Sequence, residues 1–197
     1  PRARYVIASL VDMRPSEHQA QTQSVAQELG VVIDSVSLAQ GSVELASDLV
    51  ETVIALPEPR YNPIGAEPGS ISRVDVPWPA TVPDGGRHGF LASDTVAFEA
   101  AVADAAAVVG ASIDPARAVV VLGHEELMYL PQRLAAALQE NGHPALYQTT
   151  TRSPAYVLDE PGYPLRRGFR FRAPEADDTE FRYLYNAAGP ENALIVL

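Results

Sequence analysis

Two short polar stretches of the chain, each directly after an apolar run, carry residue types that bind anions. Residues 149–153 read Thr-Thr-Thr-Arg-Ser after the run at 145–148, and residues 123–126 read Gly-His-Glu-Glu after the run at 118–122. The first stretch offers four hydroxyl groups and one guanidinium within five residues, which suits a phosphate or a carboxylate. We therefore predict that a phosphate is bound by Thr150, Thr151, Arg152 and Ser153. The alternative is a turn whose hydroxyls bond to its own backbone, with Arg152 solvated or ion-paired.

Three side chains are the candidates for catalysis, namely His124, His88 and Glu126. A histidine titrates close to neutral pH, although a hydrogen-bonded structural role is the alternative for each of the two. Glu126 could hold a ribose hydroxyl, act as a general base or bind Mg²⁺ through water. Glu125 and Glu126 fall in the first turn of an expected helix, where a carboxylate stabilises the helix with no further role. The sequence has no metal-ligand triad, so no metal site is predicted; the cofactor stays unknown, with Mg²⁺ as the one candidate.

A third polar stretch, residues 85–89, reads Gly-Gly-Arg-His-Gly. Glycine lets the main chain approach a ligand closely, and we expect Gly86 and Gly123 to do so. Arg87 could meet a second anionic group, and the alternative is a tight turn with an exposed arginine. Asp12 and Arg14, which follow the first apolar run, are interpreted as an ion pair at the end of a strand.

An α/β fold is expected to position these stretches. The apolar runs at 5–11 and 31–38 predict strands, and the polar segment between Pro15 and Gly30 predicts a helix that joins them. Two apolar strands joined by a helix imply a right-handed crossover in a parallel sheet. Further helices are predicted at 94–109 and 125–139, and further strands at 118–122, 145–148, 168–172, 181–186 and 193–197. The expected architecture is a Rossmann-like sheet, parallel or mostly parallel, with flanking helices, and ligands of such sheets bind at the carboxyl ends of the strands.

Composition limits the class of protein further. The absence of cysteine excludes disulfide scaffolds, thiolate metal sites and thiol nucleophiles, and the absence of lysine excludes a Schiff base and a P-loop lysine. The net charge of -11 makes nucleic acid an unlikely partner. A weaker alternative is a nucleic-acid adaptor that uses Arg166, Arg167, Arg170 and Arg172 and stacks bases on the interleaved Phe169 and Phe171. No apolar run reaches the ~18 residues that would span a membrane, so a cytoplasmic protein with no membrane partner is expected.

Four of these stretches, in order along the chain, resemble motifs of the TRSP domain. Residues 151–154 read Thr-Arg-Ser-Pro, the signature of that domain, and residues 85–90, 122–131 and 183–186 resemble its other motifs. The resemblance covers roughly residues 78–197. It implies a preceding phosphoribosyltransferase-like domain, in the same parent chain or in a partner subunit, often within operons of the tellurite-resistance type. The layout of strand, Gly-His-Glu-Glu, helix, strand and Thr-Thr-Thr-Arg-Ser also resembles half of a phosphoribosyltransferase sheet, and this analogy suggests a phosphorylated small molecule, a ribose phosphate, as ligand.

Residues 1–56 resemble the closing strand–helix–strand of a phosphoribosyltransferase domain. Residues 57–77, within a segment rich in proline and glycine, are predicted to be a linker, with a long functional loop as the alternative. A phosphoribosyltransferase binds its diphosphate donor with two adjacent acids after a strand and a Thr/Gly-rich loop, and this sequence contains no such stretch. We therefore expect the chain to be a piece of a longer protein and to lack transferase activity alone.

Two functions remain open at this point. In the first, the TRSP-like domain is an enzyme that binds and processes a phosphorylated ribosyl or nucleotide-like metabolite. In the alternative, it is a non-catalytic ligand-binding or regulatory module that completes a phosphoribosyltransferase site. Ligand affinity that survives Glu126→Gln and His88→Ala would favour the second.

Overall fold

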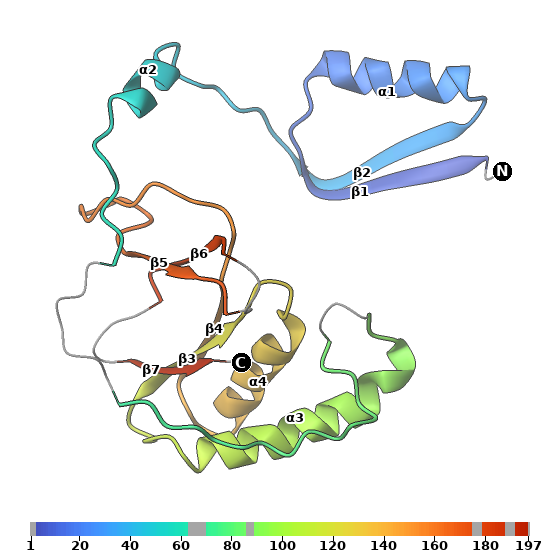
Figure 1. Cartoon of the computed structure of the whole chain (residues 1–197). Coiled ribbons are helices and arrows are strands. Elements are labelled where there is room, and N and C mark those ends of the chain that lie inside the picture. Colours follow the sequence, from blue (N-terminus) through green and yellow to red (C-terminus); the bar gives the residue numbers. More distant parts are fainter. Residues whose placement is uncertain (1–2, 63–69, 86–88, 175–178, 188–191, 197) are drawn as a thin grey trace. The chain divides into compact units, whose positions relative to one another are not determined.

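The computed structural model describes residues 3–62, 70–85, 89–174, 179–187 and 192–196 (Figure 1). The chain divides into two compact units, Pro1–Pro57 and Glu58–Leu197. Each unit has its own sheet and helices, and each is described by itself below.

The first unit is the strand–helix–strand that the sequence predicts. Strand β1 (Arg4–Asp12) and strand β2 (Val32–Gln40) are parallel, with Arg4 opposite Val32, and helix α1 (Ser16–Glu28) connects them. Pro15 precedes the helix in an extended conformation, and Gly30 follows it in the left-handed region with a φ of 62°, as helix ends favour. A short helix, α2 (Leu49–Ile54), was not predicted.

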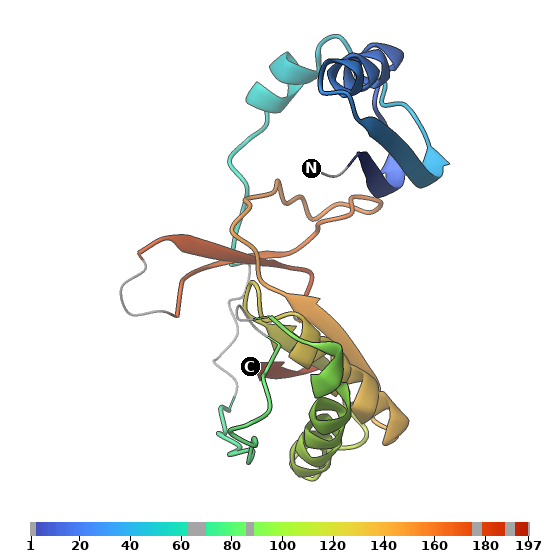
Figure 2. The ribbon, with the colours of Figure 1, turned by 90° about the vertical axis from the view of Figure 1, so that its right-hand side faces the viewer.

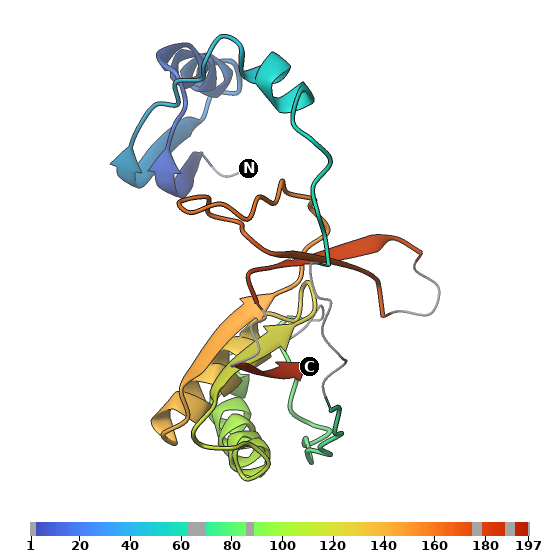
Figure 3. The same cartoon turned by 90° about the vertical axis from the view of Figure 1, so that its left-hand side faces the viewer.

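The second unit is layered around a parallel sheet of strand order β4-β3-β7 (Figures 2 and 3). Its strands are β3 (Ala118–Gly123), β4 (Ala145–Thr149) and β7 (Asn192–Val196). Helix α3 (Thr95–Gly110), preceded by the short 3₁₀ helix Ala92–Asp94, and helix α4 (Tyr129–Glu140) pack on one face of this sheet, against Val119 and Val121. Strands β5 (Gly168–Arg172) and β6 (Phe181–Tyr185) form an antiparallel pair on the other face.

Alternation along β3 explains this layering. Successive side chains of a strand point to opposite faces, so Val119 and Val121 meet the helices while Val120 and Leu122 meet the β5–β6 pair. Phe169 and Phe171 of β5 pack against Val120 and Leu122. All of β3 after Ala118 is buried, as expected for the central strand of a covered parallel sheet.

The fold is mixed α/β, as predicted, and the described residues form short parallel and antiparallel sheets; a Rossmann-like sheet stays a prediction. They form three separate sheets, two parallel and one antiparallel. The reason lies in β5, where Arg170 and Arg172 alternate with two phenylalanines and stay exposed. A strand inside a parallel sheet is covered on both faces, and such a strand could not keep two arginines in water. The β5–β6 pair therefore lies across the sheet instead of joining it.

The helix predicted over 125–139 begins later than expected, at Tyr129. Glu125 has a φ of 47°, in the left-handed region that a helix excludes, and residues 125 and 126 form a turn. The prediction that Glu125 and Glu126 lie in the first turn of a helix is therefore wrong. Both glutamates lie in the connection between β3 and α4.

Part of the Pro/Gly-rich segment packs onto the second unit. The Asn62 side chain donates to the carbonyl of Arg170 and accepts from its N–H, at 3.1 and 2.7 Å, and the Tyr61 hydroxyl donates to the carbonyl of Ala155. Trp78 lies edge-on to Phe98, with ring centroids 5.7 Å apart. Within the described segments, no helix is long and apolar enough to cross a membrane.

Candidate functional site

The two polar stretches of the second unit lie side by side, because the strands that precede them are paired. β3 ends at Gly123 directly opposite Thr149, the last residue of β4. The N–H of Thr150 donates to the carbonyl of Gly123 at 3.1 Å, and the Thr149 hydroxyl donates to the carbonyl of Glu125 at 3.2 Å. The connection after β3 is thereby tied to the connection after β4 at one edge of the sheet.

Glu125 is the centre of this site. Its carboxylate accepts a two-pronged pair of hydrogen bonds from Arg152, with Nε–Oε1 at 2.9 Å and Nη2–Oε2 at 2.6 Å. Arg182 of β6 forms a second ion pair with Oε1 of the same carboxylate. Only 5% of the Glu125 side chain and 1% of the Arg182 side chain are exposed, whereas 61% of the Arg152 side chain is exposed. One buried carboxylate thus joins an arginine from the β4 connection to an arginine from the antiparallel pair.

Arg182 was not among the predicted site residues. Its signal in the sequence is weak: it occupies the same face of β6 as Leu184, which is buried, so the strand pattern places a charge where an apolar residue belongs. A buried arginine needs a carboxylate, but nothing local identifies Glu125, which precedes it by 57 positions, as that partner.

These arginines fix the ionisation of Glu125. The hydrogen bonds from Arg152 are the largest cause, and the charge of Arg182 adds to them; together they outweigh burial and lower the pKa of Glu125 to about 2. Glu125 is therefore ionised at neutral pH and does not exchange a proton there. Its role at that pH is to hold the two arginines.

We expect the stability of the second unit to fall between about pH 4.5 and pH 2 because of this group. A carboxyl whose folded pKa is depressed stabilises the fold above its unfolded pKa, and this stabilisation is lost as the pH falls through the folded pKa. The measurement is the urea midpoint followed by fluorescence of the one tryptophan, Trp78, which lies in the second unit. In Glu125→Gln the decrease over this window should be much smaller. Parallel pH curves for the two proteins would contradict the assignment.

His124 is oriented by Thr150. The Thr150 hydroxyl lies 3.0 Å from Nδ1 of His124 and accepts the N–H of Glu125 at 3.1 Å. Nε2 of His124 is buried. The structure thus brings His124, Thr150 and Arg152, which are three of the predicted site residues, together with Glu125, which the sequence analysis did not assign to the site.

Glu126 lies at the outer side of the site. Its side chain is 51% exposed, and Oε1 lies 3.8 Å from Nη2 of Arg152. The part of the chain that the structure describes holds no cluster of three or more potential metal ligands. If Mg²⁺ bound here, Glu126 would be its protein ligand, with water and phosphate oxygens completing the shell.

Thr151 and Ser153 form a hydrogen bond within their own turn. Such a bond is expected if this stretch is a turn whose hydroxyls bond to its own backbone, which is the alternative to phosphate binding. The Thr151 hydroxyl accepts the N–H of Ser153 at 3.1 Å, and the Thr151 backbone forms a bridge with Tyr183 of β6. The Ser153 carbonyl accepts the hydroxyl of Tyr185 at 3.0 Å, and that hydroxyl accepts the N–H of Ala155 at 2.7 Å. Burial raises the pKa of Tyr185 to about 12, so the phenol keeps its proton. The Thr-Arg-Ser-Pro stretch therefore joins the parallel sheet to the β5–β6 pair.

Two other predicted features have different outcomes. Gly86, Arg87 and His88 lie outside the described residues. The alternative in which Phe169 and Phe171 stack nucleobases is wrong, because both side chains pack against the core residues of β3. Arg170 points away from that core, with its guanidinium 4.8 Å from the centroid of the Phe181 ring.

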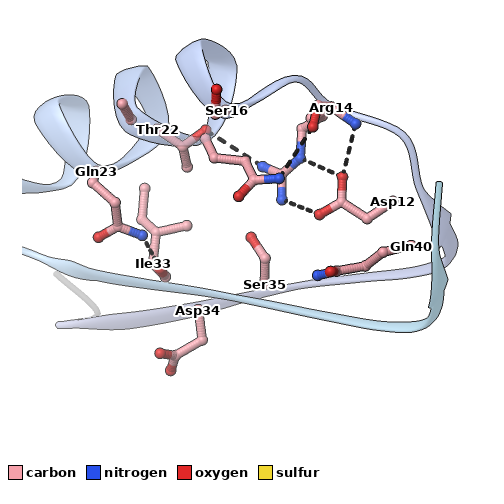
Figure 4. A pocket seen from close by; sticks show the side chains of 11 residues that line it. Asp12, Arg14, Ser16, Thr22, Gln23, Ile33, Asp34, Ser35 and Gln40 are labelled. Atoms are coloured by element: carbon pink, nitrogen blue, oxygen red, sulfur yellow. Dashed lines mark hydrogen bonds and ion pairs between the residues drawn. The ribbon is translucent and has the colours of Figure 1, made fainter. Parts of the chain in front are cut away.

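The first unit contains a separate polar hollow of about 480 Å³ between α1 and its sheet (Figure 4). Asp12 and Arg14 form the expected ion pair at the end of β1, with Nη2–Oδ2 at 2.7 Å and Nε–Oδ1 at 2.9 Å. Hydrogen bonds from Arg14 lower the pKa of Asp12 to about 2. The guanidinium of Arg14 is thus already neutralised by an acid of the same hollow.

The comparisons with known proteins give one match, and it lies in the second unit. No curated protein and no solved structure matches the chain. One family model does match, over residues 84–197, and it is described as the TRSP domain C-terminal to PRTase_2, a phosphoribosyltransferase domain. The match covers more than half of the chain and includes both connections that build the site. The chain therefore belongs to the TRSP-domain family.

Proposed function

We propose that the TRSP domain of this chain binds the phosphoryl group of a phosphorylated ribosyl or nucleotide-like metabolite, which it handles together with a phosphoribosyltransferase domain. The observation that carries the proposal is the convergence of Arg152 and Arg182 on Glu125, at the edge where β3 and β4 end. The link to such a metabolite comes from the family description, which places the domain after PRTase_2. A cytoplasmic location and a stress-linked, tellurite-resistance-type pathway belong to the same proposal.

Charge is the first support for this proposal. Two guanidinium groups share one buried carboxylate, and the half-exposed carboxylate of Glu126 lies 3.8 Å from Arg152. Arg182 is buried, and Arg152 is the member of the group that reaches solvent. An exposed arginine at the ends of the strands can recognise phosphate oxygens in a planar, two-pronged geometry. The pair between Glu126 and Arg152 is exposed to solvent and longer than the pair with Glu125, so an anion could compete with Glu126 for Arg152.

The neighbouring side chains support a role in binding more than one in catalysis. Glu125 is ionised and paired, so it cannot serve as a general acid or base at neutral pH. His124 stays the candidate for proton transfer; its Nδ1 lies 3.0 Å from the Thr150 hydroxyl and its Nε2 is buried, so the ring would have to become exposed before it could exchange a proton with a metabolite. In this proposal the half-exposed Glu126 would bind Mg²⁺ together with the phosphoryl oxygens. The second candidate function, a non-catalytic binding module, rests on the paired state of Glu125.

The test is the shift of the melting temperature by inorganic phosphate and by ribose 5-phosphate, at matched ionic strength. At a ligand concentration about 100-fold above Kd the stabilisation is about 2.7 kcal/mol, or a few degrees in Tm. We expect the wild-type chain to show this shift and Arg152→Ala to lose it. Arg166→Ala is the matched control, because Arg166 is also about half exposed and also pairs with a carboxylate, that of Asp159 at 2.6 Å. Equal shifts in the two variants would refute phosphate binding at Arg152.

A second variant distinguishes phosphate that is bound alone from phosphate that is bound together with Mg²⁺. Glu126→Gln removes a negative charge near Arg152, so the affinity for phosphate without Mg²⁺ should rise roughly threefold to tenfold. If Glu126 holds Mg²⁺, the same variant should lose affinity in the presence of Mg²⁺. Turnover that disappears in His124→Ala while affinity is kept would identify an enzyme; affinity with no turnover in the wild type would identify a binding module.

A further inference from the structure

The antiparallel pair of β5 and β6 has one face toward the core of the second unit and one face toward solvent. Residues directly opposite each other in such a pair share a face, so Phe171 and Arg182 lie together on the side of the core. We call the opposite side the outer face, and it carries Arg170, Arg172, Phe181 and Tyr183. Both of its arginines are exposed, and so is 42% of Phe181. The outer face is thus a surface of cations and aromatic rings.

Aromatic rings hold the two guanidinium groups of the outer face in place. The guanidinium of Arg170 lies 4.8 Å from the centroid of the Phe181 ring and 5.7 Å from that of Tyr61. The guanidinium of Arg172 lies 5.8 Å from the centroid of Phe181. Tyr61 is itself fixed, because its hydroxyl donates to a backbone carbonyl at 2.8 Å and its ring packs on Tyr183. A guanidinium that already rests on a ring loses less conformational entropy when it binds a ligand.

The part of the chain that the structure describes neutralises neither of these cations. Within it, Arg170 and Arg172 make contacts with aromatic rings but form no ion pair. Other described arginines of this acidic protein, with its net charge of -11, do pair with carboxylates, namely Arg4, Arg14, Arg73, Arg133, Arg152, Arg166 and Arg182. Two neighbouring cations left for solvent in a chain rich in acids indicate a surface that recognises an anion.

We propose that the outer face binds an acidic peptide segment of a partner protein in extended conformation. Arg170 and Arg172 occupy alternate positions of β5, so their α carbons are roughly 6.7 Å apart. Two carboxylates at alternate positions of an extended peptide have the same spacing, and each could accept a two-pronged pair of hydrogen bonds from one guanidinium. The segment that fits therefore has an acid at every second position.

Single-stranded nucleic acid fits the outer face less well. Its bases would need free ring faces on which to stack. The Phe181 ring already supports two guanidinium groups, and the Tyr183 ring lies against those of Tyr61 and Tyr185, with centroids 5.6 and 6.3 Å apart. The net charge of -11 also repels a polyanion more strongly than a short peptide with few carboxylates. These contacts and charges favour the peptide.

The experiment adds the full chain to a fluorescein-labelled decapeptide in which aspartate alternates with threonine, and follows the fluorescence anisotropy. The comparison ligands are the same peptide with asparagine in place of aspartate and an oligouridylate of equal length. We expect the aspartate peptide to bind saturably and the other two to bind much more weakly. Its affinity should fall as the salt concentration rises, because the charges that meet are exposed.

The variants separate charge from the support of the ring. Replacing Arg170 and Arg172 together with glutamine should weaken the binding of the peptide roughly tenfold or more, since each exposed pair contributes about threefold to fivefold. Phe181→Leu keeps both charges but removes the ring, and should weaken binding roughly twofold to tenfold. The matched control is Arg166→Gln, which removes an exposed arginine of the same unit that is already paired with Asp159, and it should bind as wild type does.

Three results would overturn the proposal. The first is an aspartate peptide that does not bind the wild-type chain, or binds no better than the asparagine peptide. The second is an unchanged affinity in the double variant of Arg170 and Arg172. The third is tighter binding of the oligouridylate, which would make nucleic acid the occupant. The phosphate-induced shift in Tm depends on Arg152 and should persist in the double variant, so this proposal and the proposed function can fail separately.

Discussion

Replacing Glu125 with glutamine is expected to lower the unfolding free energy of the second unit by about 3–5 kcal/mol at pH 7. The carboxylate is the shared partner of Arg152 and Arg182, and Arg182 is 1% exposed. Without Glu125 the guanidinium of Arg182 would stay buried with its main counter-charge removed, and an uncompensated buried charge is far more costly than the loss of an exposed pair. Urea unfolding followed by Trp78 fluorescence measures the change.

Two further variants test whether the loss of stability comes from the buried charge of Arg182. Asp75→Asn breaks the ion pair between Arg73 and Asp75, whose side chains are both almost fully exposed, and it should leave the urea midpoint unchanged. Arg182→Met in the Glu125→Gln background removes the buried charge itself, and part of the lost stability should return because an apolar side chain replaces it. If Glu125→Gln were as stable as wild type, the carboxylate would not be holding the two arginines together.

Much of the secondary structure could be predicted because its signals are local. The apolar runs of β1, β2, β3 and β4, the proline before α1 and the glycine after it gave correct elements within a few residues. The start of α4 could not be predicted in the same way. It depends on Glu125 adopting a left-handed conformation that the ion pairs with two distant arginines stabilise, and helix propensity alone favours a helix from that residue onward.

The place where the polar stretches meet could be predicted from the sequence, but the hydrogen bonds and ion pairs between them could not. Polar residues after two paired strands must meet, which brought His124, Thr150 and Arg152 together. The sequence left open whether Arg152 binds a ligand or an acid, and the structure places it on Glu125. The bridge from Thr151 to Tyr183 and the bonds of Tyr185 are non-local contacts between two sheets, which no spacing along the chain reveals.

Gly123→Ala is expected to destabilise the second unit by about 3 kcal/mol, the upper part of the range for overpacking. A Cβ at this position would overlap the carbonyl oxygen of Leu127 and would lie 2.7 Å from Cγ of Pro131, which is fully buried in α4. A backbone oxygen and a helix cannot move aside as the end of a flexible side chain can. The close approach at Gly123 is therefore to the protein's own chain, and it sets the course of the connection that carries His124 and Glu125.

The matched control for this variant is Gly142→Ala. Gly142 has a φ of 90°, and a Cβ added there would meet nothing within 4 Å, so its replacement costs only the backbone strain of about 1 kcal/mol. The difference between the two urea midpoints isolates the steric overlap at Gly123. The displaced connection also moves Glu125, whose two hydrogen bonds orient Arg152. Because Arg152 loses that fixed orientation, Gly123→Ala should weaken the phosphate-induced shift in Tm, and Gly142→Ala should keep it. Equal stability of the two variants would mean that the connection between β3 and α4 can shift to accept a side chain. The close contact at Gly123 would then not be what fixes the position of Glu125.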